Sequence, residues 1–90
     1  MTAAAGTSFR LYGIARSYAG DGSDCVRLRC DERVTTGDST GSRLLGWRWC
    51  DETWADTAAG QRAGLARALE LNRAEHARMR RSMAGWGGAR

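Results

Sequence analysis

The stretch "DCVRLRCDERVT", residues 24–35, decides the fold because apolar and charged side chains alternate along it. In an extended chain, successive side chains point to opposite sides, so the two kinds separate onto two faces. The apolar face holds Val26, Leu28, Cys30 and Val34. This pattern predicts a strand of an antiparallel sheet that is packed on one face and exposed to water on the other.

Flanking stretches with similar alternation predict one strand on each side of this one. Residues 8–18 ("SFRLYGIARSY") precede it across a turn in which Asp21-Gly22 is the favoured pair for a two-residue type I′ hairpin. Residues 43–50 ("RLLGWRWC") follow it across a second turn at 37–42. Because both connections are short, we expect a three-stranded antiparallel meander.

The two turns predict how the strands pair. A hairpin centred on Asp21-Gly22 places Phe9 opposite Val34, and a second turn centred between residues 39 and 40 places Cys30 opposite Trp49. Both hairpins then direct their apolar side chains to the same face. The expected core of the sheet consists of Phe9, Leu11, Ala15, Val26, Leu28, Cys30, Val34, Leu45, Trp47 and Trp49.

A helix is predicted for residues 57–83, where apolar side chains recur at spacings of three, four and seven. Asp56 or Thr57 can act as its N-cap, and Gly85 follows as a helix stop. The helical residues expected to cover the core of the sheet are Ala58, Leu65, Ala68 and Leu69. The order β-β-β-α, with the helix packed on one face of the meander, defines an α+β fold.

The chain of 90 residues is expected to form one domain. Its sheet would occupy residues 8–50 and its helix residues 57–83, between flexible ends at 1–7 and 85–90. The start, "MTAAAGTS", has neither the basic nor the apolar region of a secretory signal, and no apolar run is long enough to cross a membrane. We therefore expect a cytoplasmic protein with reduced cysteines.

The three cysteines lack the paired spacing of a zinc knuckle. Cys25 and Cys30 lie five positions apart in one predicted strand, so they should point to opposite faces. We expect them, with Cys50, to act as small hydrophobic residues that are buried or half-buried. A zinc site that adds His76, and a disulfide or redox role, remain as alternatives.

Residues suited to catalysis are scarce. The chain has one histidine, no clustered pair of core carboxylates, and no glycine-rich phosphate loop between a strand and a helix. A cysteine–histidine pair would also need a third residue to orient the histidine, and none is identified. We expect a non-enzymatic protein with no catalytic residue, no metal and no cofactor.

Arginine supplies all fourteen basic side chains, and the formal net charge is +4. Guanidinium groups are suited to phosphates, carboxylates and aromatic rings. On the face opposite the core, the expected register gathers arginines and a tyrosine against one acidic residue, Asp31. This pattern predicts a nucleic-acid-binding surface, while a solvated polar face is the alternative. The residues assigned to this surface are Arg10, Tyr12, Arg16, Arg27, Arg29, Arg33 and Arg48.

A three-stranded meander followed by a helix, entered through "WADTA" (residues 54–58), resembles the arm-type DNA-binding domain of phage integrases. The likeness spans residues 8–71 and rests on the topology and this one junction. It implies that the exposed face of the sheet enters the major groove of DNA. The positions that carry over are Arg27, Arg29 and Arg48, with Arg10 and Arg16 beside them. The predicted helix is longer than in that family, and no catalytic integrase domain follows.

The predicted helix is about 40 Å long at 1.5 Å per residue, which exceeds the length of the predicted sheet. Its last three turns are therefore expected to extend past the sheet and to mediate dimerisation or bind a partner protein through residues 72–83. The alternative is a curled tail in which Trp86 folds back over the methionines. The residues assigned to this interface are Asn72, His76, Met79, Arg80 and Met83. The alternative function is accordingly a protein-binding module, such as a phage-encoded inhibitor of the anti-CRISPR kind that acts on a nucleic-acid-processing complex.

Overall fold

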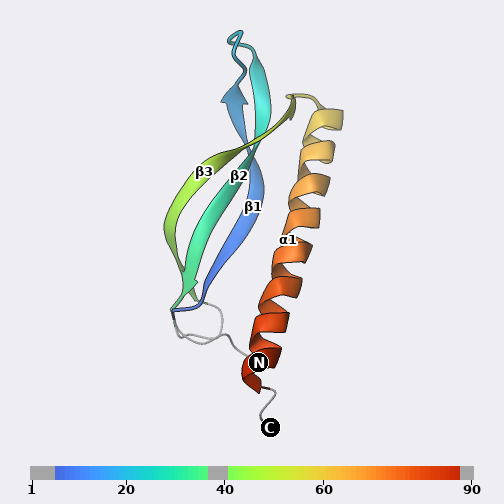
Figure 1. Ribbon diagram of the computed structural model, residues 1–90. Coiled ribbons are helices and arrows are strands. Elements are labelled where there is room, and N and C mark those ends of the chain that lie inside the picture. Colours follow the sequence, from blue (N-terminus) through green and yellow to red (C-terminus); the bar gives the residue numbers. More distant parts are fainter. Residues whose placement is uncertain (1–5, 37–40, 88–90) are drawn as a thin grey trace.

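The protein is a three-stranded sheet followed by one long helix. The computed structural model describes the backbone of residues 6–36 and 41–87, and their side chains as far as Arg81. The elements are β1 (Ser8–Tyr18), β2 (Asp24–Thr35), β3 (Ser42–Ala55) and α1 (Ala58–Gly87). The strands form one antiparallel sheet in the order β1-β2-β3, and α1 runs alongside β1 (Figure 1). The predicted α+β class and β-β-β-α order are confirmed.

The ends of two elements differ from the sequence prediction. β3 continues to Ala55, beyond the predicted end at Cys50. α1 continues to Gly87, so Gly85 does not stop the helix. Most of the predicted turn at 37–42 and of the predicted end segments lies outside the described residues.

The hairpin between β1 and β2 has a three-residue loop, Gly20-Asp21-Gly22. The Ala19 amide donates to the Ser23 carbonyl at 2.8 Å, and the Gly22 amide donates to the Ala19 carbonyl at 2.9 Å. Gly22 has a φ of 84°, which closes the loop in the left-handed region. The Asp21 carboxylate accepts hydrogen bonds from the Ser23 amide at 3.0 Å and the Ser23 hydroxyl at 2.6 Å. The predicted two-residue loop is therefore wrong by one residue.

This extra loop residue shifts the pairing of β1 with β2. Ile14 lies opposite Leu28, and Phe9 lies opposite Arg33 rather than the predicted Val34. A shift of one residue moves every side chain of a strand to the other face. Ile14 therefore lies on the face that packs against α1, which we call the helix face. Leu11, predicted to be in the core, lies on the opposite face, which we call the outer face.

The pairing of β3 with β2 also differs from the prediction. Asp31 lies opposite Trp47 and Arg29 opposite Trp49, whereas Cys30, the predicted partner of Trp49, lies opposite Arg48. The register shifts at two places, between Arg27 and Arg29 and between Glu32 and Arg33. These shifts determine which side chains of β3 point to each face. Both tryptophans are thus on the outer face and not in the predicted core.

The helix begins at a threonine cap and faces the sheet with small residues. The hydroxyl oxygen of Thr57 accepts a hydrogen bond from the Gly60 amide at 3.0 Å, as an N-cap residue does. Gly64 and Ala68 are buried, one helical turn apart. Leu65 and Leu69, one residue further around the helix, are 55% and 50% exposed. Among the described residues, no helix combines the length and the apolar character needed to cross a membrane.

The close approach of α1 explains why the leucines do not face the sheet. A Cβ atom on Gly64 would lie 3.0 Å from Cγ2 of Ile14 and 3.1 Å from Cε3 of Trp54. Only residues without a large side chain fit at this distance. The predicted contact through Leu65 and Leu69 is therefore wrong, and Ala58 is exposed as well, whereas the contact through Ala68 is confirmed.

The buried core is small. It contains Cys25, Val26, Leu28, Cys30 and Ala68. The predicted core positions Val26, Leu28 and Cys30 are thus confirmed. Leu11, Leu45 and Trp47 were also predicted to be buried, but each is about half exposed. Much of the apolar surface of the sheet consequently faces outward.

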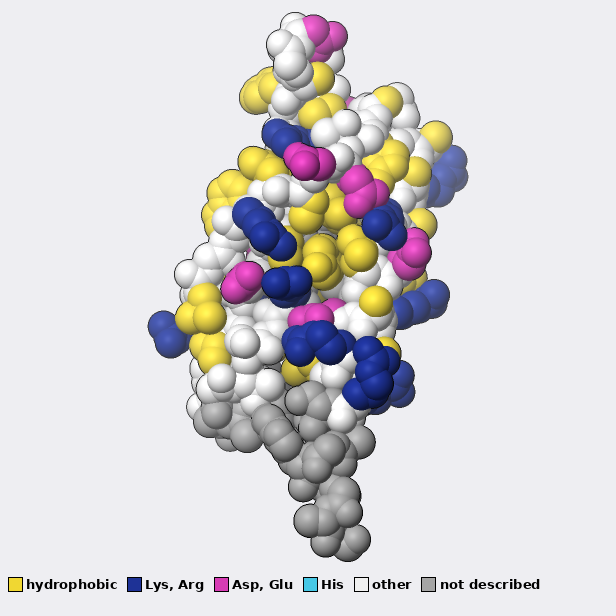
Figure 2. All heavy atoms as spheres, viewed as in Figure 1, with side chains coloured by type: hydrophobic (Ala, Val, Ile, Leu, Met, Phe, Trp, Pro, Cys, Tyr) yellow, Lys and Arg dark blue, Asp and Glu magenta, His cyan; other side chains and the backbone are white. Residues whose placement is uncertain are grey.

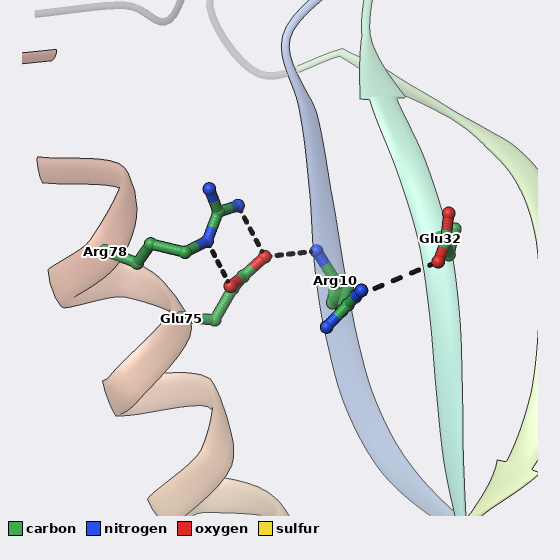
Figure 3. A network of polar contacts seen from close by, with 4 residues as sticks. All are labelled: Arg10, Glu32, Glu75 and Arg78. Carbon is green, nitrogen blue, oxygen red and sulfur yellow. Dashed lines mark hydrogen bonds and ion pairs between the residues drawn. The ribbon is translucent and has the colours of Figure 1, made fainter. Parts of the chain in front are cut away.

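Two side chains of α1 form hydrogen bonds with the main-chain groups of β1 that do not pair with β2. Oδ1 of Asn72 accepts a hydrogen bond from the Tyr12 amide at 2.8 Å, and Nδ2 of Asn72 donates to the Tyr12 carbonyl at 2.9 Å. Oε2 of Glu75 accepts from the Arg10 amide at 2.6 Å (Figure 3). An edge strand needs partners for these groups, and α1 supplies them. The helix therefore stays on the sheet at Asn72, where it was predicted to extend past it.

Candidate nucleic-acid interface

The outer face of the sheet combines arginine, tryptophan and leucine. In one row across the strands, Leu11, Asp31 and Trp47 lie side by side. The next row brings Arg29 next to Trp49. Residues on this face include Phe9, Leu11, Ala15, Arg27, Arg29, Asp31, Arg33, Leu44, Trp47 and Trp49.

Guanidinium groups lie over both outer tryptophans. Cζ of Arg29 is 4.5 Å from the centroid of the Trp47 ring, and Cζ of Arg27 is 5.4 Å from that of Trp49. The two indole rings meet edge to face, with centroids 5.2 Å apart and an interplanar angle of 81°. Cation–π and edge-to-face contacts hold the rings in place. Trp47 nonetheless remains 50% exposed.

The outer face carries an excess of positive charge. Nε of Arg29 lies 2.7 Å from Oδ1 of Asp31, and Nε of Arg33 donates to the hydroxyl of Ser42 at 2.8 Å. Arg27 has no hydrogen-bond partner for its buried Nε among the described residues. Among the described residues that pair across this face, three arginines thus lie with one aspartate.

Several arginines of the helix face and α1 are paired with acidic side chains. Here Arg10 pairs with Glu32, and Arg67 pairs with both Glu52 and Glu70. In the view of Figure 2, arginine and acidic side chains lie next to one another over the strands and the helix. Acidic partners therefore neutralise part of the arginine charge away from the outer face, whereas Arg48 and Arg73 have no ion-pair partner among the described residues.

The structure divides the seven predicted nucleic-acid-binding residues between the two faces. Arg27, Arg29 and Arg33 are on the outer face as expected. The other four, which lie on the helix face, are Arg10, Tyr12, Arg16 and Arg48. The longer hairpin loop moved the residues of β1, and the irregular pairing of β3 moved Arg48. The expected single surface of all seven residues is therefore wrong.

Two of the arginines displaced to the helix face have acidic partners there. Nε of Arg10 is 3.8 Å from Glu32, and Nε of Arg16 is 3.2 Å from Asp56. Burial and then the neighbouring Cys30 thiol raise the pKa of the Tyr12 hydroxyl. Arg10 and Arg16 thus have acidic neighbours, and Tyr12 lies beside the core.

The cysteines lie in or beside the core. Cys25 and Cys30 are buried, Cys50 is half-buried, and all three are free thiols. Burial and then the nearby Cys30 raise the pKa of the Cys50 thiol, which keeps it protonated at neutral pH. Within residues 6–36 and 41–81, no group of three or more histidine, cysteine or acidic side chains could hold a metal ion.

The residues assigned to a partner interface on the helix have different environments. Asn72 is bound to Tyr12, whereas His76 and Arg80 are exposed. Met79 is half-buried. The side chain of Met83 is outside the described residues. A shallow groove of about 280 Å³ between β1 and α1 is lined by Phe9, Arg10, Leu11, Asn72, Glu75, His76 and Met79.

Sequence reasoning missed Trp47 and Trp49 as surface residues. Their alternation with Arg48 was visible in "WRW", but the expected register assigned them to the core. Gly20, which directly precedes Asp21-Gly22 and permits a three-residue loop, was a signal for the shifted face of β1 but not for the tryptophans, whose placement follows the irregular pairing of β3 with β2. Comparison of the chain with protein-family models, curated proteins and solved structures finds no match.

Proposed function

We propose that this chain is a small, non-enzymatic protein that binds nucleic acid through the outer face of its sheet. The observation that carries the proposal is the half-exposed ring of Trp47 beside the guanidinium group of Arg29, 4.5 Å away. Guanidinium groups bind phosphates, and aromatic rings stack on bases. Their combination on one face suits a ligand that presents both.

The charge distribution also supports this proposal. The positive excess of Arg27, Arg29 and Arg33 over Asp31 lies on a face that none of the described elements covers. An anionic ligand would relieve the mutual repulsion of these arginines. The resemblance to an integrase arm domain supports the same ligand class, and a cytoplasmic location is part of the proposal.

A salt-titrated binding assay tests the proposed function. Fluorescence anisotropy of labelled oligonucleotides would be measured between about 50 and 200 mM salt. Changing Arg27, Arg29 and Arg33 together to alanine should weaken binding. It should also make the dependence of log affinity on log salt concentration shallower by about 2 to 3, because each phosphate contact contributes about 0.7 to 0.9.

The helix face supplies a control with the same change in charge. Changing Arg10, Arg16 and Arg48 together to alanine should leave most of the affinity intact, because these side chains are on the other face. Thermal unfolding would verify that both triple variants are folded. Equal losses of affinity in the two variants would contradict a site on the outer face.

A second candidate function is a protein-binding module, of which a phage-encoded inhibitor of a nucleic-acid-processing complex is one example. The exposure of Leu65 and Leu69 on α1 favours it, since a pair of leucines one turn apart is a common anchor for a partner protein. Absence of oligonucleotide binding at low salt, together with retention of a specific protein by the intact chain but not by a Leu65→Ala, Leu69→Ala variant, would favour this second function.

A further inference from the structure

The outer face exposes large apolar side chains beside its arginines. Leu11, Leu44 and Trp47 are each between 41% and 50% exposed. The backbone of a duplex presents charged phosphates and sugars, which leave such side chains without an apolar partner. The flat faces of bases are such partners, and they are accessible in a single strand.

This apolar surface continues from the sheet into the groove beside the helix. Leu11 belongs to both, because it shares a row with Asp31 and Trp47 and also lines the groove. Trp47 and Leu11 are separated by β2, so two interstrand spacings, about 10 Å, lie between their backbones. The far wall of the groove is formed by His76 and Met79 of α1.

Two exposed arginines, Arg73 and Arg80, border the groove on the helix side. Arg73, His76 and Arg80 recur at spacings of three and four, which places them along one side of α1. Both arginines are exposed, and neither has an ion-pair partner within the described part of the chain. The groove therefore offers an apolar floor and a cationic border.

We infer that the nucleic acid bound by this protein is single-stranded, and that it runs from Trp47 across β1 into the groove between β1 and α1. This inference rests on the proposed function. One base stacks on Trp47, a neighbouring base covers Leu11 and Met79, and the phosphates between and beyond them contact Arg29, Arg73 and Arg80.

The bound strand should be recognised with little regard to sequence. Asn72 is the one side-chain amide in the groove, and both of its groups are already bonded to the Tyr12 backbone. Asp31 is likewise engaged by Arg29. Stacking and phosphate contacts accept any base, whereas the amide and carboxylate groups here that could read base edges are already engaged.

Titrations with single strands and duplexes test the inference. Oligo(dT) and oligo(U) of about 4 to 16 nucleotides and a mixed-sequence duplex would be compared by anisotropy and by tryptophan fluorescence. We expect the single strands to bind at least about tenfold more tightly than the duplex and to quench the fluorescence. Equal or tighter binding of the duplex would refute the inference while leaving the proposed function intact. Binding of neither would reject both.

Variants locate the path of the strand. Trp47→Ala should weaken binding by about 5- to 150-fold, the effect of losing one stacked base. Trp47→Phe keeps a ring and should retain part of the affinity, which separates stacking from a folding defect. Reversing the charge border with Arg73→Glu and Arg80→Glu should weaken oligo(dT) binding strongly and make its salt dependence shallower.

A charge-matched control completes the design. Arg43 is on the helix face of β3, and Arg81 follows Arg80 on another side of α1, and both are exposed. The double variant Arg43→Glu, Arg81→Glu should bind oligo(dT) more tightly than Arg73→Glu, Arg80→Glu does. Equal affinities of the two double variants, with binding still sensitive to Trp47, would exclude the groove from the path while retaining the outer face.

Discussion

The side-chain amide of Asn72 forms two hydrogen bonds with one residue of the neighbouring strand, to the amide of Tyr12 at 2.8 Å and to its carbonyl at 2.9 Å. This pair replaces the bonds that a fourth strand would make with β1. It joins residues 60 positions apart in the chain. Asn72 therefore fixes both the position of α1 along β1 and its rotation about the helix axis.

Replacement of Asn72 by alanine should destabilise the fold by about 1 to 3 kcal/mol, because a half-buried donor and acceptor of Tyr12 would lose their partners. The free energy of unfolding would be measured by urea denaturation. Arg73→Ala is the control, since its exposed side chain should change stability by no more than about 0.5 kcal/mol. Equal stability of the Asn72 variant and wild type would show that the paired hydrogen bonds do not hold the helix on the sheet.

Replacement of Gly64 by alanine should also be destabilising. Its Cβ would lie 3.0 Å from Ile14 and 3.1 Å from Trp54, and overpacking of this kind costs about 1 to 3 kcal/mol. The higher helix propensity of alanine offsets up to about 1 kcal/mol of that cost. Gly46→Ala, whose Cβ would meet no atom within 4 Å, should be neutral or stabilising. Thermal melts of the two variants would separate a tight contact from a general intolerance of alanine.

Alanine substitutions at the two loop glycines, Gly20 and Gly22, should differ in their effect on stability. Gly22 has a φ of 84°, so Gly22→Ala should cost about 1 to 2 kcal/mol of unfolding free energy. Gly20, in the same loop, has no positive φ, and a Cβ atom added to it would meet no atom within 4 Å, so Gly20→Ala should have little effect. Denaturation of both variants by urea would measure the difference. A larger loss for Gly20→Ala would argue against the three-residue loop.

The carboxylate of Glu75 predicts a pH-dependent contribution to stability. The hydrogen bonds from Arg78 and from the Arg10 amide hold the pKa of Glu75 below its ordinary value of 4.5 (Figure 3). Because the pKa is lower in the folded state, the stabilisation is complete above the ordinary value and is lost as pH falls through the folded-state value. Glu75→Gln should therefore be less stable at neutral pH, by about 0.5 to 1 kcal/mol because Arg78 is half exposed.

Urea denaturation across the acid range would measure this effect. Glutamine can still accept a hydrogen bond from the Arg10 amide, so the difference from wild type reports mainly the ion pair with Arg78. The two proteins should converge in stability as the carboxylate becomes protonated. Glu70→Gln is the control, because the 70% exposed Glu70 side chain forms only a surface ion pair. A difference that persists unchanged at low pH would contradict the assignment to the charge of Glu75.

The alternation within residues 24–35 was sufficient to predict the order of the elements and the buried face of β2. Val26, Leu28 and Cys30 are buried on one face, and the residues that alternate with them, Arg27 and Arg29, point to the other. The alternation alone could not predict which side chains of β1 face the helix. It depends on whether the hairpin loop has two or three residues, and a difference of one residue exchanges Tyr12 and Ile14 with Leu11 and Ala15.

The helix shows a similar one-residue error for a different reason. Leu65 and Leu69 have the apolar character expected of a core contact, but Gly64 and Ala68 face the sheet. The distance between α1 and the sheet decides this, and it depends on contacts between residues far apart in sequence, such as Gly64 with Ile14 and Trp54. As a result, the candidate site was predicted with the right arginines of β2 but without the tryptophans of β3.

The attachment of α1 along β1 determines at which edge the sheet can pair with an additional strand. On the β1 side, the main-chain groups of Arg10 and Tyr12 are already occupied by Glu75 and Asn72. An incoming strand, whether from a second copy of the chain or from a foreign protein, would have to displace the helix there. Sheet extension, and with it any strand exchange or fibrous association, is therefore directed to β3, where Leu44 and Leu45 are exposed.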